Sequence, residues 1–353
     1  MINTKRICLL FLSLFLMFSV TLKSQEPKNI ILVVVDGFSF DQLSALMISN
    51  GGTSNLFKLS KTGFLNTADS NSNTVNPIVA LSQIATGTKP AQGGLGIDNN
   101  STRVSSILDL AHAKNKATGL VSTASLLYPS TAAFYAHQSN YQKLEKVSYD
   151  LYLSDIDVFI GGGMKYFKDR TDDFDVLREL RKKGYKLIDE PKNLSKGRSK
   201  KIAAIVYPEE VPNAGKRDDY LNEAWHKAFR TLIKDERGYF LVISLPQQDW
   251  ACHSRDEDHL MKELKELDAF IGRIYNYVGV DKETLLVVVS AFENGSIAIL
   301  ESNVKSKDVK IRINSTTPAP VLVPVFANGP GSEYFTGVYS YTNLFEKLVM
   351  FLY

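Results

Sequence analysis

Asp36 is a carboxylate placed where an α/β protein would use one for chemistry. It follows Ile30 to Val35, a run of β-branched residues and leucine that is typical of a strand buried on both faces of a parallel sheet. Ligands of open α/β sheets bind outside the carboxyl ends of such strands, so Asp36 is a candidate metal or phosphate-site residue. The alternative is that Asp36 only caps the helix expected in the next segment, FSFDQLSALM.

Asp249 and His253 form a second candidate pair, four residues apart in the segment DWACH. This spacing, in a helix or turn, can place a carboxylate and an imidazole on one metal ion. The alternative interpretation is an exposed Asp–His pair that caps a helix beginning near Ser254.

Apolar strand patterns alternate with amphipathic helical patterns along most of the chain, which predicts an α/β fold: a three-layer sandwich with a central, mostly parallel sheet flanked by helices. The predicted strands are 30–35, 118–122, 158–161, 186–188, 202–206, 239–244, 285–290 and 321–326. The clearest predicted helices are 104–114, 174–183, 218–234, 256–278 and 342–352. A short hairpin is expected within 301–317.

Residues 1–24 are predicted to be a signal peptide, because Lys5 and Arg6 precede the apolar run Ile7 to Leu22. A retained membrane anchor is the alternative, although the run is shorter than the usual span of about 20 residues. We therefore expect export to the periplasm or the extracellular space and a single domain over residues 25–353, with no transmembrane segment. The formal net charge of the full chain is only +3, and nothing indicates nucleic-acid binding.

Several segments, in order, resemble the alkaline phosphatase family, and together they cover nearly the whole predicted mature chain. They are NIILVVVDGFSFDQ, IATGTKPAQGGLGID, KATGLVSTASLLYPSTAAFYAH, DIDVFIGGGMKYF, RGYFLVISLPQQDWACH, TLLVVVSAF and the closing segment from Val321 to Leu352. The resemblance implies the family's fold and the hydrolysis of phosphoric monoesters. It also implies the family's machinery: a serine nucleophile between two zinc ions, a nearby magnesium ion and a phosphate-binding arginine.

The resemblance places Asn76 and Pro77 where the family has Asp-Ser. Proline has no hydroxyl and no N–H, so it can neither attack phosphorus nor bind a metal. Thr74 is a weak substitute nucleophile, because in-line attack demands tight placement. The phosphate-binding arginine falls at Tyr141, so no confident catalytic residue remains.

The metal sites implied by the resemblance are incomplete. The first zinc site keeps Asp249 and His253, but its other histidine should stand near Pro318, where none is found. The second keeps Asp36, while its expected Asp-His pair is replaced by Phe292 and by Glu293, a weak oxygen ligand. Zinc bound at a residual site by Asp36, Asp249, His253 and Glu293 therefore remains an alternative.

At the implied magnesium site, the family's acid, hydroxyl and glutamate correspond to Tyr128, Ser130 and Ser244. A hard cation prefers about six oxygen ligands with carboxylates among them, so magnesium is not expected. The expected lining of the former site is Asn76, Tyr128, Ser130, Tyr141, Ser244, Phe292 and Pro318.

These losses predict an exported pseudophosphatase that binds an unidentified ligand or protein partner, in a crevice made aromatic by Tyr128, Tyr141, Trp250 and Phe292. The first alternative is an active hydrolase with a remodelled one- or two-metal site, using Thr74 or a metal-bound water. The second is a structural or secreted interaction protein. The excursion at about 291–320 is shorter than in many relatives, which puts the homodimer implied by the resemblance in doubt.

Overall fold

The computed structural model describes residues 26–68, 74–90 and 93–353. The predicted signal peptide, residues 1–24, lies outside these ranges. Within them, no helix is both long enough and apolar enough to cross a membrane.

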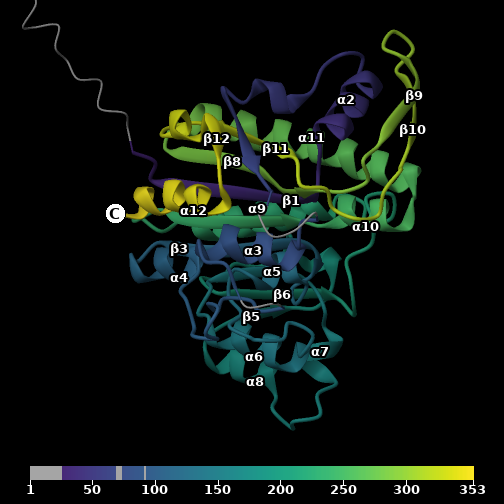
Figure 1. Ribbon diagram of the computed structural model, residues 1–353. Helices are drawn as coiled ribbons and strands as arrows, with labels where there is room; N and C mark the ends of the chain where they lie inside the picture. Colours follow the sequence, from purple (N-terminus) through teal and green to yellow (C-terminus); the bar gives the residue numbers. More distant parts are fainter. Residues whose placement is uncertain (1–25, 69–73, 91–92) are drawn as a thin grey trace, which may run out of the picture.

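A ten-strand sheet runs through the centre of the molecule (Figure 1). In spatial order its strands are β12 (Gly337–Tyr339), β2 (Lys61–Asn66), β11 (Leu322–Asn328), β8 (Thr284–Glu293), β1 (Asn29–Gly37), β7 (Tyr239–Leu245), β3 (Ala117–Ser125), β4 (Val158–Gly162), β6 (Ile202–Tyr207) and β5 (Lys186–Ile188). The strands from β8 to β5 are all parallel, whereas β11 pairs antiparallel with both of its neighbours. The prediction of a mostly parallel sheet is confirmed.

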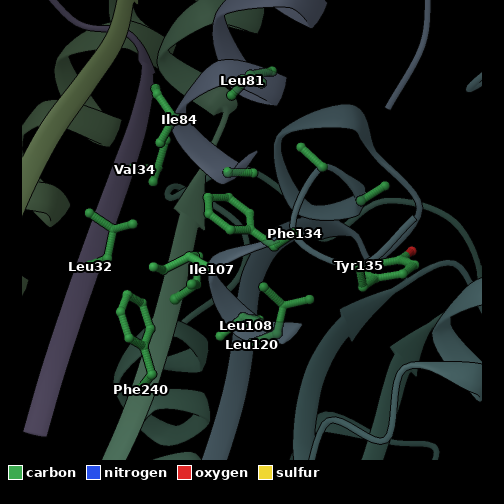
Figure 2. Close-up of a cluster of buried hydrophobic side chains, with 14 of the residues drawn as sticks. Leu32, Val34, Leu81, Ile84, Ile107, Leu108, Leu120, Phe134, Tyr135 and Phe240 are labelled. Atoms are coloured by element: carbon green, nitrogen blue, oxygen red, sulfur yellow. The ribbon is translucent and has the colours of Figure 1, made fainter. Parts of the chain in front are cut away.

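Strand β1 lies between β8 and β7, and all nine of its residues are buried. Its side chains alternate between two apolar cores, because successive residues of a strand point to opposite faces. Ile30, Leu32 and Val34 belong to one core, and the residues between them belong to the other. Figure 2 shows part of the first core, in which Leu32 and Val34 face side chains of helices on that side of the sheet.

Helices cover both faces of the sheet and complete the three layers (Figure 1). The core with Ile31 and Val33 is covered by α2 (Phe40–Ser49), α9 (Tyr220–Leu232), α10 (Gln247–Ser254) and α11 (Glu257–Asp281). The opposite core is covered by α3 (Pro77–Thr86), α4 (Ile107–Ala113), α5 (Pro129–Ala132), α6 (Leu144–Leu153), α7 (Lys165–Lys168), α8 (Val176–Lys182) and α12 (Tyr341–Val349). The predicted fold class is confirmed.

The structure differs from the sequence predictions mainly at the edges of elements. The helix predicted to begin at Val104 begins at Ile107, because Ser106 and Asp109 form a capping box there. The expected hairpin is formed by β9 (Ala298–Asn303) and β10 (Asp308–Arg312), which project from the body of the molecule (Figure 1). Strands β2 and β12 were not predicted.

Candidate ligand-binding crevice

Asp36 lies near the carboxyl end of β1, directly beside the helix that carries Asp249. Gly37 makes this approach possible, because a Cβ atom there would lie 2.9 Å from the Cα atom of Asp249. Its φ of +76° is also a conformation that favours glycine. Asp36 and Asp249, two of the three carboxylates expected from the sequence as site residues, thus lie on neighbouring segments of the fold.

The Asp36 side chain is 0% exposed, and neither of its oxygens has a hydrogen-bond partner of normal geometry among the described residues. Burial raises the pKa of this carboxyl well above its usual range, and the charge of Asp249 raises it further. The nearby Ser130 hydroxyl opposes this change only in part. Burial and Asp249 thus favour the neutral form of Asp36, and the helix-cap alternative is wrong because Ser39 caps α2.

Asp249 is almost fully buried, and both of its oxygens have partners within the chain. The Asn294 amide donates to Oδ1 at 2.7 Å, and Nε2 of His253 lies 3.4 Å from Oδ2. The hydrogen bond with Asp249 is the main reason why the pKa of the half-exposed His253 imidazole is raised. Asp249 and His253 face each other along α10, as their spacing of four predicted.

The carboxylate of Glu293 accepts hydrogen bonds from two backbone N–H groups. One oxygen accepts the N–H of Ser296 at 2.6 Å, and the other accepts the N–H of Ala319 at 3.2 Å. Burial raises the pKa of Glu293, although these two hydrogen bonds oppose the change. The preceding residue, Phe292, is 1% exposed and pairs with Asp36 between β8 and β1, where it adds apolar surface.

Pro77 is the first residue of α3, and the side chain of Asn76 caps this end of the helix. The side-chain oxygen of Asn76 accepts the backbone N–H groups of Ile78 at 3.0 Å and Val79 at 3.3 Å. A helix N-terminus binds anions through such N–H groups, so Asn76 occupies donors that a phosphate would need.

A crevice of about 800 Å³ lies at the carboxyl ends of β3, β6 and β7. The predicted site residues that line it are Thr74, Asn76, Pro77, Tyr128, Tyr141, Asp249 and His253. The other predicted site residues do not line it: Asp36, Ser130, Ser244 and Phe292 are buried, and Glu293 and Pro318 also lie outside the lining. Trp250 packs edge-on against Tyr128, with ring centroids 5.0 Å apart, and does not itself line the crevice.

The family model described as "Alkaline phosphatase" matches residues 27–301, which is most of the chain. The chain belongs to the alkaline phosphatase family. Alkaline phosphatase 4 of Bacillus subtilis is 28% identical over 295 residues, covering 78% of this chain and 63% of that protein. Alkaline phosphatase 3 of the same organism is 26% identical over 242 residues, covering 65% of this chain and 52% of its own length. The chain thus spans only 63% and 52% of the lengths of these two relatives.

Among solved structures, the alkaline phosphatase from the Antarctic bacterium TAB5 superposes with a TM-score of 0.85 and 28% identity, covering 94% of this chain and 99% of that one. The fold expected from the resemblance is confirmed by this likeness.

The zinc ions of alkaline phosphatases need at least three protein ligands each at a catalytic site. The described part of this chain contains no group of three or more His, Cys, Asp or Glu side chains placed to hold a metal ion. Asp249 is satisfied by Asn294 and His253, and Glu293 is satisfied by backbone N–H groups. The residues in this arrangement do not fit a zinc site.

The implied magnesium position is occupied by a buried network of hydroxyl groups. Ser244 donates to Ser130 at 3.0 Å, and the Thr131 hydroxyl oxygen lies 2.8 Å from that of Ser122 and 3.2 Å from that of Ser244. Neutral hydroxyls suit a hydrogen-bonded core better than a hard dication, which prefers carboxylates among its ligands.

The lining also includes Glu210 and Tyr166, which the sequence did not lead us to expect. Glu210 follows β6, lines the crevice and accepts the backbone N–H of Ser125; burial raises its pKa. Tyr166 adds a further ring to the lining. Glu210 stands three residues after the end of β6, so a search for acids shortly after predicted strands would have found it, together with Glu209.

Proposed function

We propose that this chain is an exported, catalytically inactive member of the alkaline phosphatase family that binds an organic ligand in the crevice. The observation that carries the proposal is the start of α3, where Pro77 supplies no nucleophile and Asn76 caps the N–H groups of Ile78 and Val79. Phosphoryl transfer requires a nucleophile together with positive groups on the phosphate oxygens.

The charges of the crevice support the same conclusion. Its described lining contains the carboxylates Asp249 and Glu210 but no lysine or arginine. The internal segments outside the described ranges, DSNSN and AQ, contain no basic residue either. A phosphate monoester dianion would meet two carboxylates, and the basic group of the described lining, the His253 imidazole, is already paired with Asp249, which disfavours binding of the dianion.

An open crevice favours a binding role over a purely structural one. A volume of about 800 Å³ lies within the usual range for ligand pockets, roughly 300–1,000 Å³. The export part of the proposal rests on the apolar run Ile7 to Leu22 after Lys5 and Arg6. A protein partner and the oligomeric state stay predictions.

An active hydrolase is the second candidate, since Thr74 lines the same crevice as Asp249 and His253. One assay separates the two. Purified mature chain is incubated with 4-nitrophenyl phosphate, with and without added zinc and magnesium, beside the Asp249→Ala and Thr74→Ala variants. We expect the buffer rate in every sample and zinc well below one equivalent per chain by elemental analysis.

Metal-dependent turnover that is lost in Asp249→Ala would overturn the proposed inactivity. Loss in Thr74→Ala as well would identify the nucleophile, whereas retention there would point to a metal-bound water.

A further inference from the structure

We propose that the crevice selects a cationic organic ligand, an amine or quaternary ammonium group carried on an apolar body. This inference rests on the proposed binding function and adds the chemical class of the ligand. It follows from the charges, the aromatic faces and the rigid support of the lining.

The described lining of the crevice carries two carboxylates and one basic group, the His253 imidazole, which is paired with Asp249. Glu210 and Asp249 line it from different elements, one after β6 and the other on α10. Burial is the main cause of the raised pKa of the Tyr128 hydroxyl, and the charges of the lining carboxylates Asp249 and Glu210 raise it further. An approaching cation is attracted by the same field that opposes ionisation of Tyr128.

Three tyrosines, Tyr128, Tyr141 and Tyr166, supply aromatic surface to the lining. A cation over the face of such a ring is attracted by its quadrupole, and quaternary ammonium groups are commonly recognised in this way. The Tyr166 ring already has a cation against it, since Nζ of Lys165 lies 5.0 Å from its centroid. Leu127, Leu144 and other apolar lining residues would contact the apolar body of the ligand.

The loop that carries Glu210 is anchored by buried polar side chains. The Gln247 amide donates to the carbonyl of Val211, the next residue, at 2.7 Å and to the carbonyl of Thr123 at 2.6 Å. Arg217, farther along the loop, is buried in an ion pair with Glu263. A carboxylate fixed before the ligand arrives loses little conformational entropy on binding.

The test uses three probes with one benzyl body and different charges: benzyltrimethylammonium, benzyl alcohol and benzylphosphonate. Binding to the mature chain is measured by isothermal titration calorimetry and by the shift in Tm. We expect the cation to bind and to raise Tm, the neutral probe to bind more weakly, and the phosphonate to have no effect.

Glu210→Gln keeps the shape of the side chain and removes its charge, and we expect it to weaken cation binding by about tenfold. Glu209→Gln is the matched control, because Glu209 lies next in the chain, pairs with Lys165 and does not line the crevice. It should leave the affinity unchanged. Tyr141→Leu should weaken the cation more than the neutral probe, since leucine keeps apolar bulk and removes the ring.

Equal or tighter binding of benzyl alcohol or benzylphosphonate would overturn the charge class while leaving a binding function in place. Binding of no probe would overturn this inference. Only metal-dependent hydrolysis of 4-nitrophenyl phosphate would overturn the inactivity proposed above, so the two failures are distinguishable.

Discussion

Replacing Asp36 with asparagine is expected to stabilise the protein at neutral pH, and the gain should disappear in acid. The Asp36 carboxyl is fully buried without a hydrogen-bond partner of normal geometry among the described residues, and burial together with Asp249 raises its pKa. The unfolded chain releases this proton near pH 4, whereas the folded chain retains it, so folding becomes less favourable as pH rises. Asparagine has nearly the same shape and does not titrate.

The magnitude follows from linkage. Between the unfolded and the folded pKa, the wild type loses up to about 1.4 kcal/mol of unfolding free energy per pH unit relative to the variant. The advantage of Asp36→Asn should therefore grow as pH rises above the unfolded pKa, by at most about 3 kcal/mol from pH 5 to pH 7. In a protein of this size, this corresponds to roughly 5 °C in Tm.

Urea unfolding at pH 5, 6 and 7, with a chelator present, measures the difference. Asp173→Asn is the control, because Asp173 is exposed and its φ of 57° is tolerated by asparagine. If Asp36→Asn and wild type keep the same difference at all three pH values, or if the variant is less stable at pH 7, Asp36 is ionised in the folded chain and the reasoning fails. Repeating the series with zinc in place of the chelator would show whether a cation pairs with it.

Three further substitutions test the packing beneath the crevice, each by urea unfolding. Asn294→Ala leaves buried Asp249 without a donor and should cost about 1–3 kcal/mol; a smaller loss would mean that water replaces the amide. Gly37→Ala places a Cβ atom 2.9 Å from the Cα of Asp249 at a positive φ and should cost more than about 1 kcal/mol, whereas a neutral result would show that α10 can move away. Arg217→Met removes the buried guanidinium that pairs with Glu263 and Glu266 and leaves Glu263 with only His259 and the Ala214 N–H, so it should cost about 3 kcal/mol; a loss below about 1 kcal/mol would mean that these remaining partners compensate the charge.

The elements that the sequence predicted best are those whose residues are buried on both sides. Strand β1 was found from Ile30 to Val35 because no solvent-facing residue interrupts the apolar run. Strand β2 was missed because it lies near the sheet edge, its burial is mixed, and Gly63 interrupts it. That glycine is required by packing, since a Cβ atom there would lie 2.1 Å from the carbonyl oxygen of Phe335, a contact that no local pattern reveals.

In the candidate site, too, the sequence predicted relations between residues close in the chain and missed those between distant residues. The relation of Asp249 to His253 is local, so a spacing of four was sufficient to predict it. The hydrogen bond from Asn294 to Asp249 joins residues 45 positions apart, and an asparagine after a strand reads equally well as a turn residue. Glu293 had the right chemistry for a ligand, but its two backbone partners depend on the path of the loop that contains Ala319.

The Asn294 amide also determines how readily this protein could be converted into a metal enzyme. Its hydrogen bond stabilises Asp249 within the chain, so a substitution that frees Asp249 for a metal first destabilises the fold. Freeing Glu293 would likewise leave the N–H groups of Ser296 and Ala319 without their acceptor. Each single step toward a zinc site therefore loses stability before metal affinity can be gained, and conversion requires several coordinated substitutions. These hydrogen bonds therefore oppose the gain of a metal site through the stability of the fold alone.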